Sequence, residues 1–97
     1  MNSSYTVIVN FNAPASDQNQ ALTEIGAYIG SFLSKQPGFV RSQLCQSVDD
    51  TQIVHVAEWQ SEVAFKKFAA IARDHPDLPG LLKYKPSAAF FTVWNQY

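Results

Sequence analysis

The segment IVHVAEWQSEVAF at residues 53–65 constrains the fold more than any other part of the chain, because it joins a strand pattern directly to a helix pattern. His55 and Trp59 are four positions apart, so in a strand both rings project from the same face. Ser61 and Glu62 are typical of a helix N-cap and an acidic first turn, which the free backbone N–H groups favour. We therefore expect one strand face to carry a proton acceptor beside a large aromatic ring, just before a helix begins.

The other strands are indicated by alternation and by β-favouring composition. A strict period of two predicts a strand over residues 5–12. Residues 39–48 and 52–60 predict two more, and the short polar turn between them suits an antiparallel hairpin. Residues 88–95, which are rich in aromatic side chains, predict the last strand.

Helices are indicated where apolar residues recur at spacings of three and four. The first helix is expected to begin at residue 16 or 17 and to end before Pro37. A second helix is expected over about residues 61–73. After a turn-rich connector, Leu81 and Leu82 predict a last helical turn against the core.

The resulting β-α-β-β-α-β order predicts a single α+β domain over residues 1–97, with the ferredoxin-like plan of two helices on one face of an antiparallel sheet. Strands 5–12 and 88–95 carry bulky apolar groups on both faces, so the second face of the sheet also needs a cover. A second copy of the chain is the simplest cover. We therefore expect a homodimer in which two sheets form a dimeric α/β barrel.

Charge and composition narrow the possible partners. Seven Lys and Arg against eight Asp and Glu give a net charge of −1 without a basic run, so we expect no nucleic-acid partner and no anionic-membrane partner. No apolar run approaches the roughly 20 residues that span a bilayer, and no secretory signal is visible, so a cytoplasmic protein is expected. One cysteine and two scattered histidines predict no bound metal.

Two stretches resemble the signatures of the antibiotic-biosynthesis monooxygenase family, namely QPGFVRS at 36–42 and VAEWQSEVAF at 56–65. The resemblance covers nearly the whole chain, including FNAP at 11–14 and LPGL at 78–81, and the chain is similar in particular to the anthrone-oxidising members. It implies a dimeric α+β barrel that oxidises an aromatic polyketide, anthrone or quinol with molecular oxygen. It also implies that no flavin, haem or metal cofactor takes part, so the substrate supplies the electrons.

The departures from those anthrone-oxidising members concern the pocket. Trp59 matches the family's pocket tryptophan. In the members that oxidise anthrones, the position of His55 carries an asparagine, that of Phe65 a tyrosine, that of Cys45 a histidine and that of Pro79 an arginine. Most of their polar pocket is therefore absent from this sequence.

The haem-degrading branch of the family is a less favoured alternative. It uses an asparagine in the first strand, a tryptophan in the second helix and a histidine after that helix. Here Asn10 lies in the first strand, Phe68 takes the tryptophan position, and His75 falls a few residues before the histidine position.

Oxidation without a cofactor requires a base, because oxygen reacts slowly with closed-shell organic molecules until the substrate becomes an electron-rich anion. His55 suits this role, since an unperturbed pKa of about 6.5 leaves it largely neutral yet able to accept a proton. Trp59 is expected to stack on a flat substrate. His75, in the loop before Pro76, is a second acid or base candidate at the mouth of the pocket.

Further substrate contacts are expected from Phe65, Phe68 and Leu82, which supply an apolar enclosure, from Asn10, and from Arg41, which suits a substrate oxyanion. Each candidate also has a structural interpretation: packing for the apolar residues and an ion pair for the arginine.

The competing functional hypothesis is a non-catalytic dimeric barrel that binds a small hydrophobic ligand or serves as a regulatory or stress-related module. The two hypotheses differ in whether His55 and Trp59 share an open cavity, or whether neighbouring apolar side chains fill that space.

Overall fold

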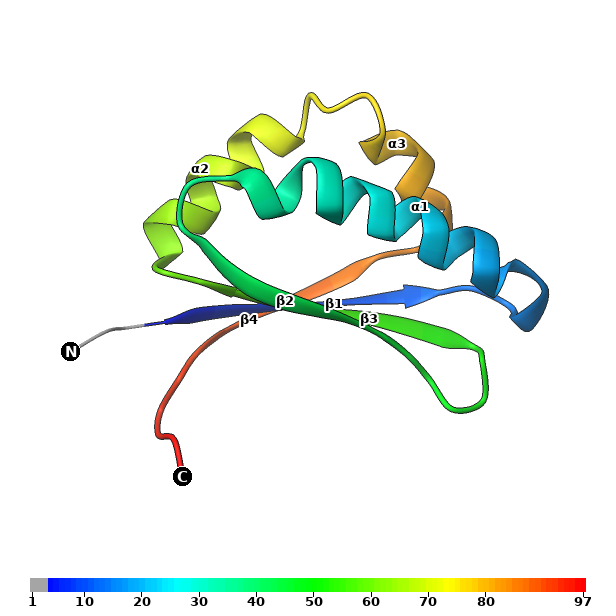
Figure 1. Ribbon diagram of the computed structural model, residues 1–97, viewed down its shortest axis with the longest axis horizontal. Helices are drawn as coiled ribbons and strands as arrows, with labels where there is room; N and C mark the ends of the chain where they lie inside the picture. Colours follow the sequence, from blue (N-terminus) through cyan, green and yellow to red (C-terminus); the bar gives the residue numbers. More distant parts are fainter. Residues whose placement is uncertain (1–3) are drawn as a thin grey trace.

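The computed structural model describes residues 4–97. The elements are β1 (Tyr5–Asn12), α1 (Gln18–Ser31), β2 (Phe39–Gln46), β3 (Gln52–Trp59), α2 (Glu62–Ala72), α3 (Leu78–Leu81) and β4 (Ser87–Thr92), with 3₁₀ turns η1 (Ala15–Asp17), η2 (Leu33–Lys35) and η3 (Leu82–Tyr84). The strands form one antiparallel sheet in the order β2-β3-β1-β4. The helices all lie on one face of this sheet (Figure 1). The predicted ferredoxin-like α+β plan is therefore confirmed.

The structure differs from the sequence-based expectation mainly near the C-terminus. β4 ends at Thr92, three residues earlier than predicted, and residues 93–97 leave the sheet on the face opposite the helices (Figure 1). The last helical turn is divided between α3 and η3, so that Leu81 is buried while Leu82 is exposed. Alternation continues beyond β4 in the sequence, but among residues 4–97 the paired register of β1 and β4 ends with Tyr5 opposite Thr92.

The corner between β3 and α2 is built by the two stretches that resemble the family signatures. Ser61 caps α2, because its side-chain oxygen accepts a hydrogen bond from the backbone N–H of Ala64 at 3.1 Å. Gly38, with φ of +88°, packs against this turn, and its carbonyl accepts a hydrogen bond from the backbone N–H of Gln60 at 2.8 Å. A Cβ at residue 38 would overlap the Cβ of Ala64. Only glycine therefore fits this corner without strain.

The core lies between the sheet and the helices. Along β3 every second residue is buried under the helix layer, namely Ile53, His55, Ala57 and Trp59. β1 contributes Val7 and Phe11 to the same layer, and α1 contributes Ala21, Ile25 and Tyr28. The period-two and helical patterns of the sequence therefore meet in one core, and the imidazole of His55 lies within it.

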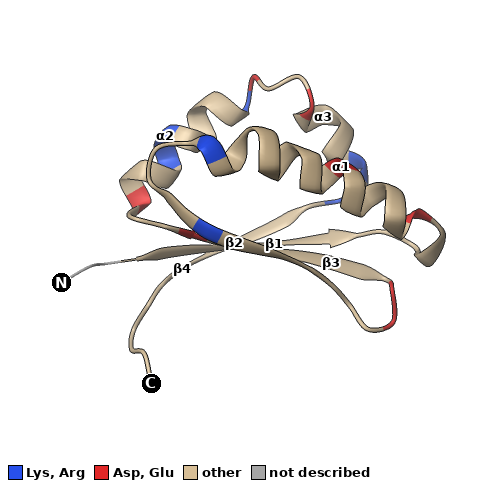
Figure 2. Ribbon diagram, in the orientation of Figure 1, with Lys and Arg blue, Asp and Glu red and all other residues tan. Residues whose placement is uncertain are grey.

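Charged side chains lie mostly on the helix layer and in the turns (Figure 2). The strands carry only two charged side chains, Arg41 in β2 and Glu58 in β3, and these form an ion pair at 3.0 Å on the face away from the helices. The same face presents exposed Phe91, which is 47% accessible. Within residues 4–97, no helix has the length and apolar character needed to cross a bilayer.

Candidate functional site

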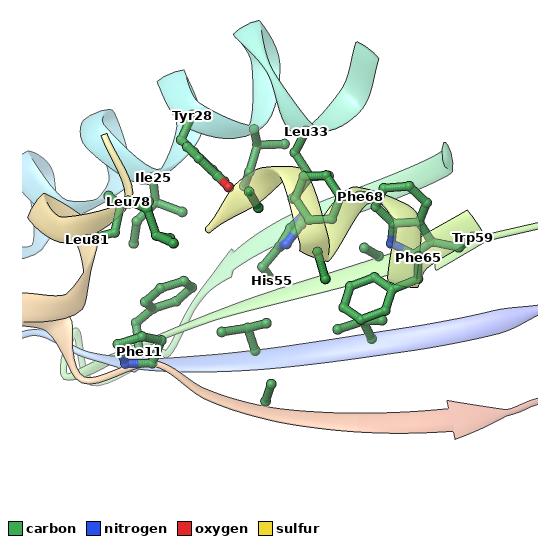
Figure 3. A pocket seen from close by; sticks show the side chains of 18 of the residues that line it. Phe11, Ile25, Tyr28, Leu33, His55, Trp59, Phe65, Phe68, Leu78 and Leu81 are labelled. Carbon is green, nitrogen blue, oxygen red and sulfur yellow. The ribbon is translucent and has the colours of Figure 1, made fainter. Parts of the chain in front are cut away.

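A cavity of about 230 Å³ lies between the sheet and the helices. Its wall is almost entirely apolar and is drawn mainly from five elements, with Val7, Val9 and Phe11 from β1, His55, Ala57 and Trp59 from β3, Ile25 and Tyr28 from α1, Phe65 and Phe68 from α2, and Leu78 and Leu81 from α3 (Figure 3). Pro86, Ala88 and Phe90 also line it and are exposed. The cavity therefore opens along the edge strand β4.

His55 is brought into this cavity by the alternation of β3. It lies directly opposite Val9 of β1 and Leu44 of β2, and it is only 4% exposed. Its Nε2 atom is buried and has no hydrogen-bond partner among residues 4–97. Burial lowers the pKa of His55 to about 4, well below the ordinary histidine value used in the sequence analysis. The imidazole is therefore neutral at neutral pH.

Trp59 and its neighbours form an aromatic wall at one end of the cavity. The ring of Trp59 stacks on Phe68 with centroids 5.1 Å apart, and it meets Phe65 and Phe39 edge-on at 5.7 Å and 5.6 Å. At 1% exposure, the indole is packed on several sides by its own chain. Phe65 and Phe68 both lie in the cavity wall, as expected, and a cavity remains beside them.

Tyr28 is a lining residue that the sequence analysis did not select. It projects from α1, one turn after Ile25 on the buried stripe, and its hydroxyl points into the cavity towards His55 (Figure 3). Burial, with a smaller effect from the charge of Asp77, raises the pKa of the Tyr28 phenol, so the hydroxyl stays protonated. The available sequence signal was a phenolic hydroxyl on an otherwise apolar helix stripe.

His75 lies beside the site but does not line the cavity. Its ring packs on Phe32, with centroids 4.3 Å apart, and meets the edge of Tyr28 at 5.2 Å and 86°. Its Nδ1 accepts a hydrogen bond from the backbone N–H of Asp77 at 3.1 Å. The structure thus brings His75 into contact with a lining residue, behind the cavity wall.

Three of the expected contact residues are not brought to the cavity. Asn10 is exposed on the opposite sheet face, because it follows Val9 in the alternation of β1. Arg41 lies on that same face, paired with a glutamate of β3. Leu82 points to solvent at 55% exposure, and the adjacent Leu81 takes the lining position. Asn10 and Leu82 are each one position away from a residue that does line the cavity, and that one position is enough to turn the side chain away from it.

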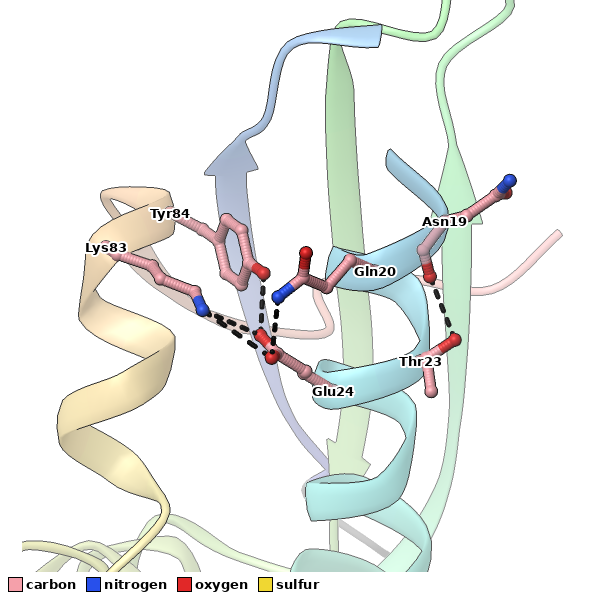
Figure 4. Close-up of polar contacts among 6 residues, drawn as sticks. All are labelled: Asn19, Gln20, Thr23, Glu24, Lys83 and Tyr84. Atoms are coloured by element: carbon pink, nitrogen blue, oxygen red, sulfur yellow. Dashed lines mark hydrogen bonds and ion pairs between the residues drawn. The ribbon is translucent and has the colours of Figure 1, made fainter. Parts of the chain in front are cut away.

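The connector that supplies Leu78 and Leu81 is fixed to α1 by a polar cluster (Figure 4). The hydroxyl of Tyr84 donates to Oε1 of Glu24 at 2.6 Å, Lys83 Nζ lies 3.2 Å from the same oxygen, and Gln20 donates to Oε2 at 3.2 Å. The hydrogen bond from Tyr84, followed by those from Gln20 and Lys83, lowers the pKa of Glu24 to about 2. This carboxylate therefore stays ionised and holds one end of the cavity cover.

Residues 4–97 contain no group of three or more His, Cys, Asp or Glu side chains arranged to hold a metal ion. Cys45 is exposed, on the sheet face away from the cavity.

The family model for antibiotic biosynthesis monooxygenases matches residues 4–72. Among solved structures, the chain is similar to a monooxygenase from the gene ActVA-Orf6 of Streptomyces coelicolor in complex with nanaomycin D, with 23% identity, a TM-score of 0.82, and 97% of this chain and 90% of that chain covered. It is also similar to a proposed monooxygenase of Shewanella loihica, with 30% identity, a TM-score of 0.76 and 99% of each chain covered.

A third similar structure is the haem-degrading protein Rv3592 of Mycobacterium tuberculosis, with 20% identity, a TM-score of 0.74, and 100% of this chain and 98% of that chain covered. No curated protein matches the chain. The family match extends over more than half of the sequence and includes the whole β1-α1-β2-β3-α2 unit that builds most of the cavity. The chain therefore belongs to the antibiotic biosynthesis monooxygenase family.

Proposed function

We propose that the protein is a cofactor-independent monooxygenase that oxidises an aromatic phenol, anthrone or quinol with molecular oxygen. The observation that carries this proposal is the buried, neutral His55, whose Nε2 has no partner among the described residues and lies in an apolar cavity with aromatic walls. A buried polar atom without a partner is costly, so its presence in a core position favours a functional contact.

His55 acts as the base in this proposal. A pKa of about 4 makes the free imidazole a weak acceptor, but a substrate anion formed beside it pairs with the imidazolium and raises that value in the complex. The apolar wall strengthens this pairing, because charges interact more strongly where water is excluded. The Nε2 atom thus takes the proton of a substrate hydroxyl, or of an acidic C–H, during turnover.

The oxygen step balances without an added cofactor. The substrate anion transfers one electron to O₂, and the resulting radical and superoxide combine at a ring carbon to give a peroxide anion. The imidazolium of His55 returns its proton to that peroxide. Cleavage of the O–O bond with loss of the hydrogen on the attacked carbon leaves one oxygen atom as a carbonyl and releases the other as water.

The ligand of one solved relative supports a small aromatic substrate. The ActVA-Orf6 structure contains nanaomycin D in the same fold. For haem, a cavity of about 230 Å³ offers little room, since pockets for drug-sized ligands span roughly 300–1,000 Å³. His75, the histidine nearest the position expected of the haem-degrading branch, already packs on Phe32 and Tyr28.

We also propose a homodimer in which the exposed sheet faces of two copies meet. Phe91 is 47% exposed on that face, and Val93 and Trp94, just beyond β4, are 45% and 88% exposed. Sedimentation equilibrium at micromolar protein concentration tests this, with a dimer expected. A stable, compact monomer contradicts the dimer. The catalytic proposal does not depend on that result and is tested by oxygen uptake.

Oxygen-electrode traces with emodin anthrone, dithranol and simple quinols test the catalytic proposal. His55→Ala should lower the rate of oxygen uptake by roughly 10²–10⁴-fold, the usual contribution of a positioned base, while anaerobic ligand binding persists. His75→Ala is the comparison variant, because it removes the other imidazole, which does not line the cavity, and it should retain oxygen uptake.

The binding-module hypothesis predicts a different result. In that case all these compounds bind anaerobically without accelerated oxygen uptake by the parent protein. Turnover of His55→Ala at the parental rate contradicts the assignment of the base.

A further inference from the structure

Two polar groups reach into the cavity from opposite walls. The imidazole of His55 comes from β3 in the sheet, and the phenol of Tyr28 comes from α1 in the helix layer (Figure 3). The rest of the lining is apolar apart from the indole of Trp59 and the exposed Arg73 at the end of α2. A flat ligand in this space therefore meets one polar contact on each side.

The hydroxyl of Tyr28 is available to a ligand. Among residues 4–97, no group accepts a hydrogen bond from it, whereas the hydroxyl of Tyr84 is bound to Glu24 at 2.6 Å. The ring of Tyr28 is held in place by edge contact with His75 and by Phe32, whose centroid lies 5.5 Å away. Because burial and the nearby Asp77 keep the phenol protonated, the group is a fixed donor at neutral pH.

The size of the cavity limits the ring system that it encloses. An apolar cavity of about 150 Å³ holds one benzene ring. A volume of about 230 Å³ is therefore suited to two fused rings, with any further substituent leaving through the opening along β4.

We propose that the substrate is a bicyclic phenol that carries a second oxygen. This inference rests on the function proposed above. His55 contacts the reacting hydroxyl, and the hydroxyl of Tyr28 donates a hydrogen bond to the second oxygen. When the reacting hydroxyl loses its proton, negative charge spreads over the conjugated ring carbons and makes a second oxygen attached to them a stronger hydrogen-bond acceptor. A donor fixed at the second oxygen stabilises that charge, because it is already oriented and lies in a space with little water.

Paired naphthols test this inference by anaerobic binding, which does not depend on turnover. The ligands are 1,3-, 1,5- and 1,8-dihydroxynaphthalene, each compared with the 1-naphthol that has a methyl group in place of the second hydroxyl. For at least one pair, Tyr28→Phe should weaken binding of the dihydroxy compound by about 5-fold, the worth of one hydrogen bond, and leave the methyl compound within about 2-fold. Tyr97→Phe, which removes an exposed phenolic hydroxyl outside the cavity, should change neither.

Three outcomes overturn the inference. Equal losses for the hydroxyl and methyl compounds show that Tyr28 only shapes the wall, and unchanged binding of both shows that it makes no contact. Binding of anthrones without binding of any naphthol by the parent protein excludes the bicyclic class. Oxygen uptake by the parent protein tests the proposed function separately. A failure of the substrate inference can therefore be distinguished from a failure of the proposed function.

If Tyr28→Phe does not fold, the parent protein still tests whether the cavity prefers a ligand that carries a second oxygen. In at least one pair, the dihydroxy compound should then bind about 5-fold tighter than its methyl partner, despite being more polar. Tighter binding of the methyl compound in every pair overturns the inference.

Discussion

The ring of Trp59 lies stacked on the ring of Phe68, with centroids 5.1 Å apart and an interplanar angle of 30°. The sequence analysis expected the indole to offer a stacking face to a substrate. In the structure the indole is also in T-shaped contact with Phe39 and Phe65 of its own chain. Trp59 is therefore first a packing residue that shapes the cavity end.

Trp59→Ala should lower the free energy of unfolding by about 3–5 kcal/mol, because it empties one of the largest fully buried sites. Trp59→Phe should cost less, since a smaller ring keeps the contact with Phe68. Urea denaturation at fixed protein concentration measures both. Parental stability of Trp59→Ala, together with a large loss of ligand binding, contradicts the packing role.

The free energy of unfolding should decrease as the pH is lowered through the range in which His55 is protonated. The folded state lowers the pKa of His55 to about 4, whereas the unfolded chain has a value of about 6.5. The unfolded state therefore binds the proton first as the pH drops. Stability is complete above pH 6.5 and is lost as the pH falls through 4, by about 3 kcal/mol in total. His55→Leu should remove this dependence in denaturant titrations at several pH values.

The pH profile of kcat/KM should report the same group in the free protein. Its acid-side limb should have an apparent pKa of about 4, so activity stays level between about pH 5 and 7. This replaces the limb near 6.5 that an unperturbed histidine predicts. A limb near 6.5 in oxygen-uptake assays indicates that another group, or a solvated His55, is the base.

Gly38→Ala should lower the free energy of unfolding by about 2 kcal/mol or more. The residue has φ of +88°, and its new Cβ would overlap Ala64 at the corner between β3 and α2. Gly30→Ala is the matched control, because nothing lies within 4 Å of a Cβ there and the site is within α1. That control should gain stability by up to about 1 kcal/mol in thermal or urea unfolding. Equal effects of the two changes contradict the corner geometry.

Glu24 should titrate far below a normal carboxyl group. Its pKa of about 2 depends first on the hydrogen bond from Tyr84. Tyr84→Phe should therefore raise that pKa towards the usual range, as followed by the side-chain carboxyl chemical shift in an NMR titration. Lys66→Met, which removes a distant ion pair with Glu62, should leave it unchanged. If the pKa of Glu24 is the same in Tyr84→Phe as in the parent protein, the hydrogen bond from Tyr84 to Glu24 of α1 does not form.

The sequence predicted the elements well because each carries its own periodic signal. The alternation of residues 5–12 agrees with β1, and the N-cap at Ser61 agrees with the start of α2. The same alternation correctly placed His55 and Trp59 on one face. By contrast, β4 was predicted too long, since its length depends on the strand that pairs with it.

Candidate contacts were less predictable than elements. Asn10 and Leu82 each lie one residue from a side chain that lines the cavity, Val9 and Leu81. Sequence spacing fixes which residues share a face, but the exposure of a short helical turn depends on how the connector packs. Tyr28 was missed because its place on an apolar stripe indicates burial without indicating where the hydroxyl points.

The sequence by itself determined the β-α-β-β-α-β order, the inward face of β3 and the presence of an imidazole beside an indole on that face, because these depend on local periodicity and capping. Only the tertiary structure decided that Trp59 is enclosed by Phe68 and Phe65, and that Tyr28 and His55 point into one cavity. It also decided the low pKa of His55, since desolvation depends on every element packed around a group. Local patterns therefore specify which side chains face inward, whereas the packing of α1, α2 and α3 on the sheet sets the chemistry available to them.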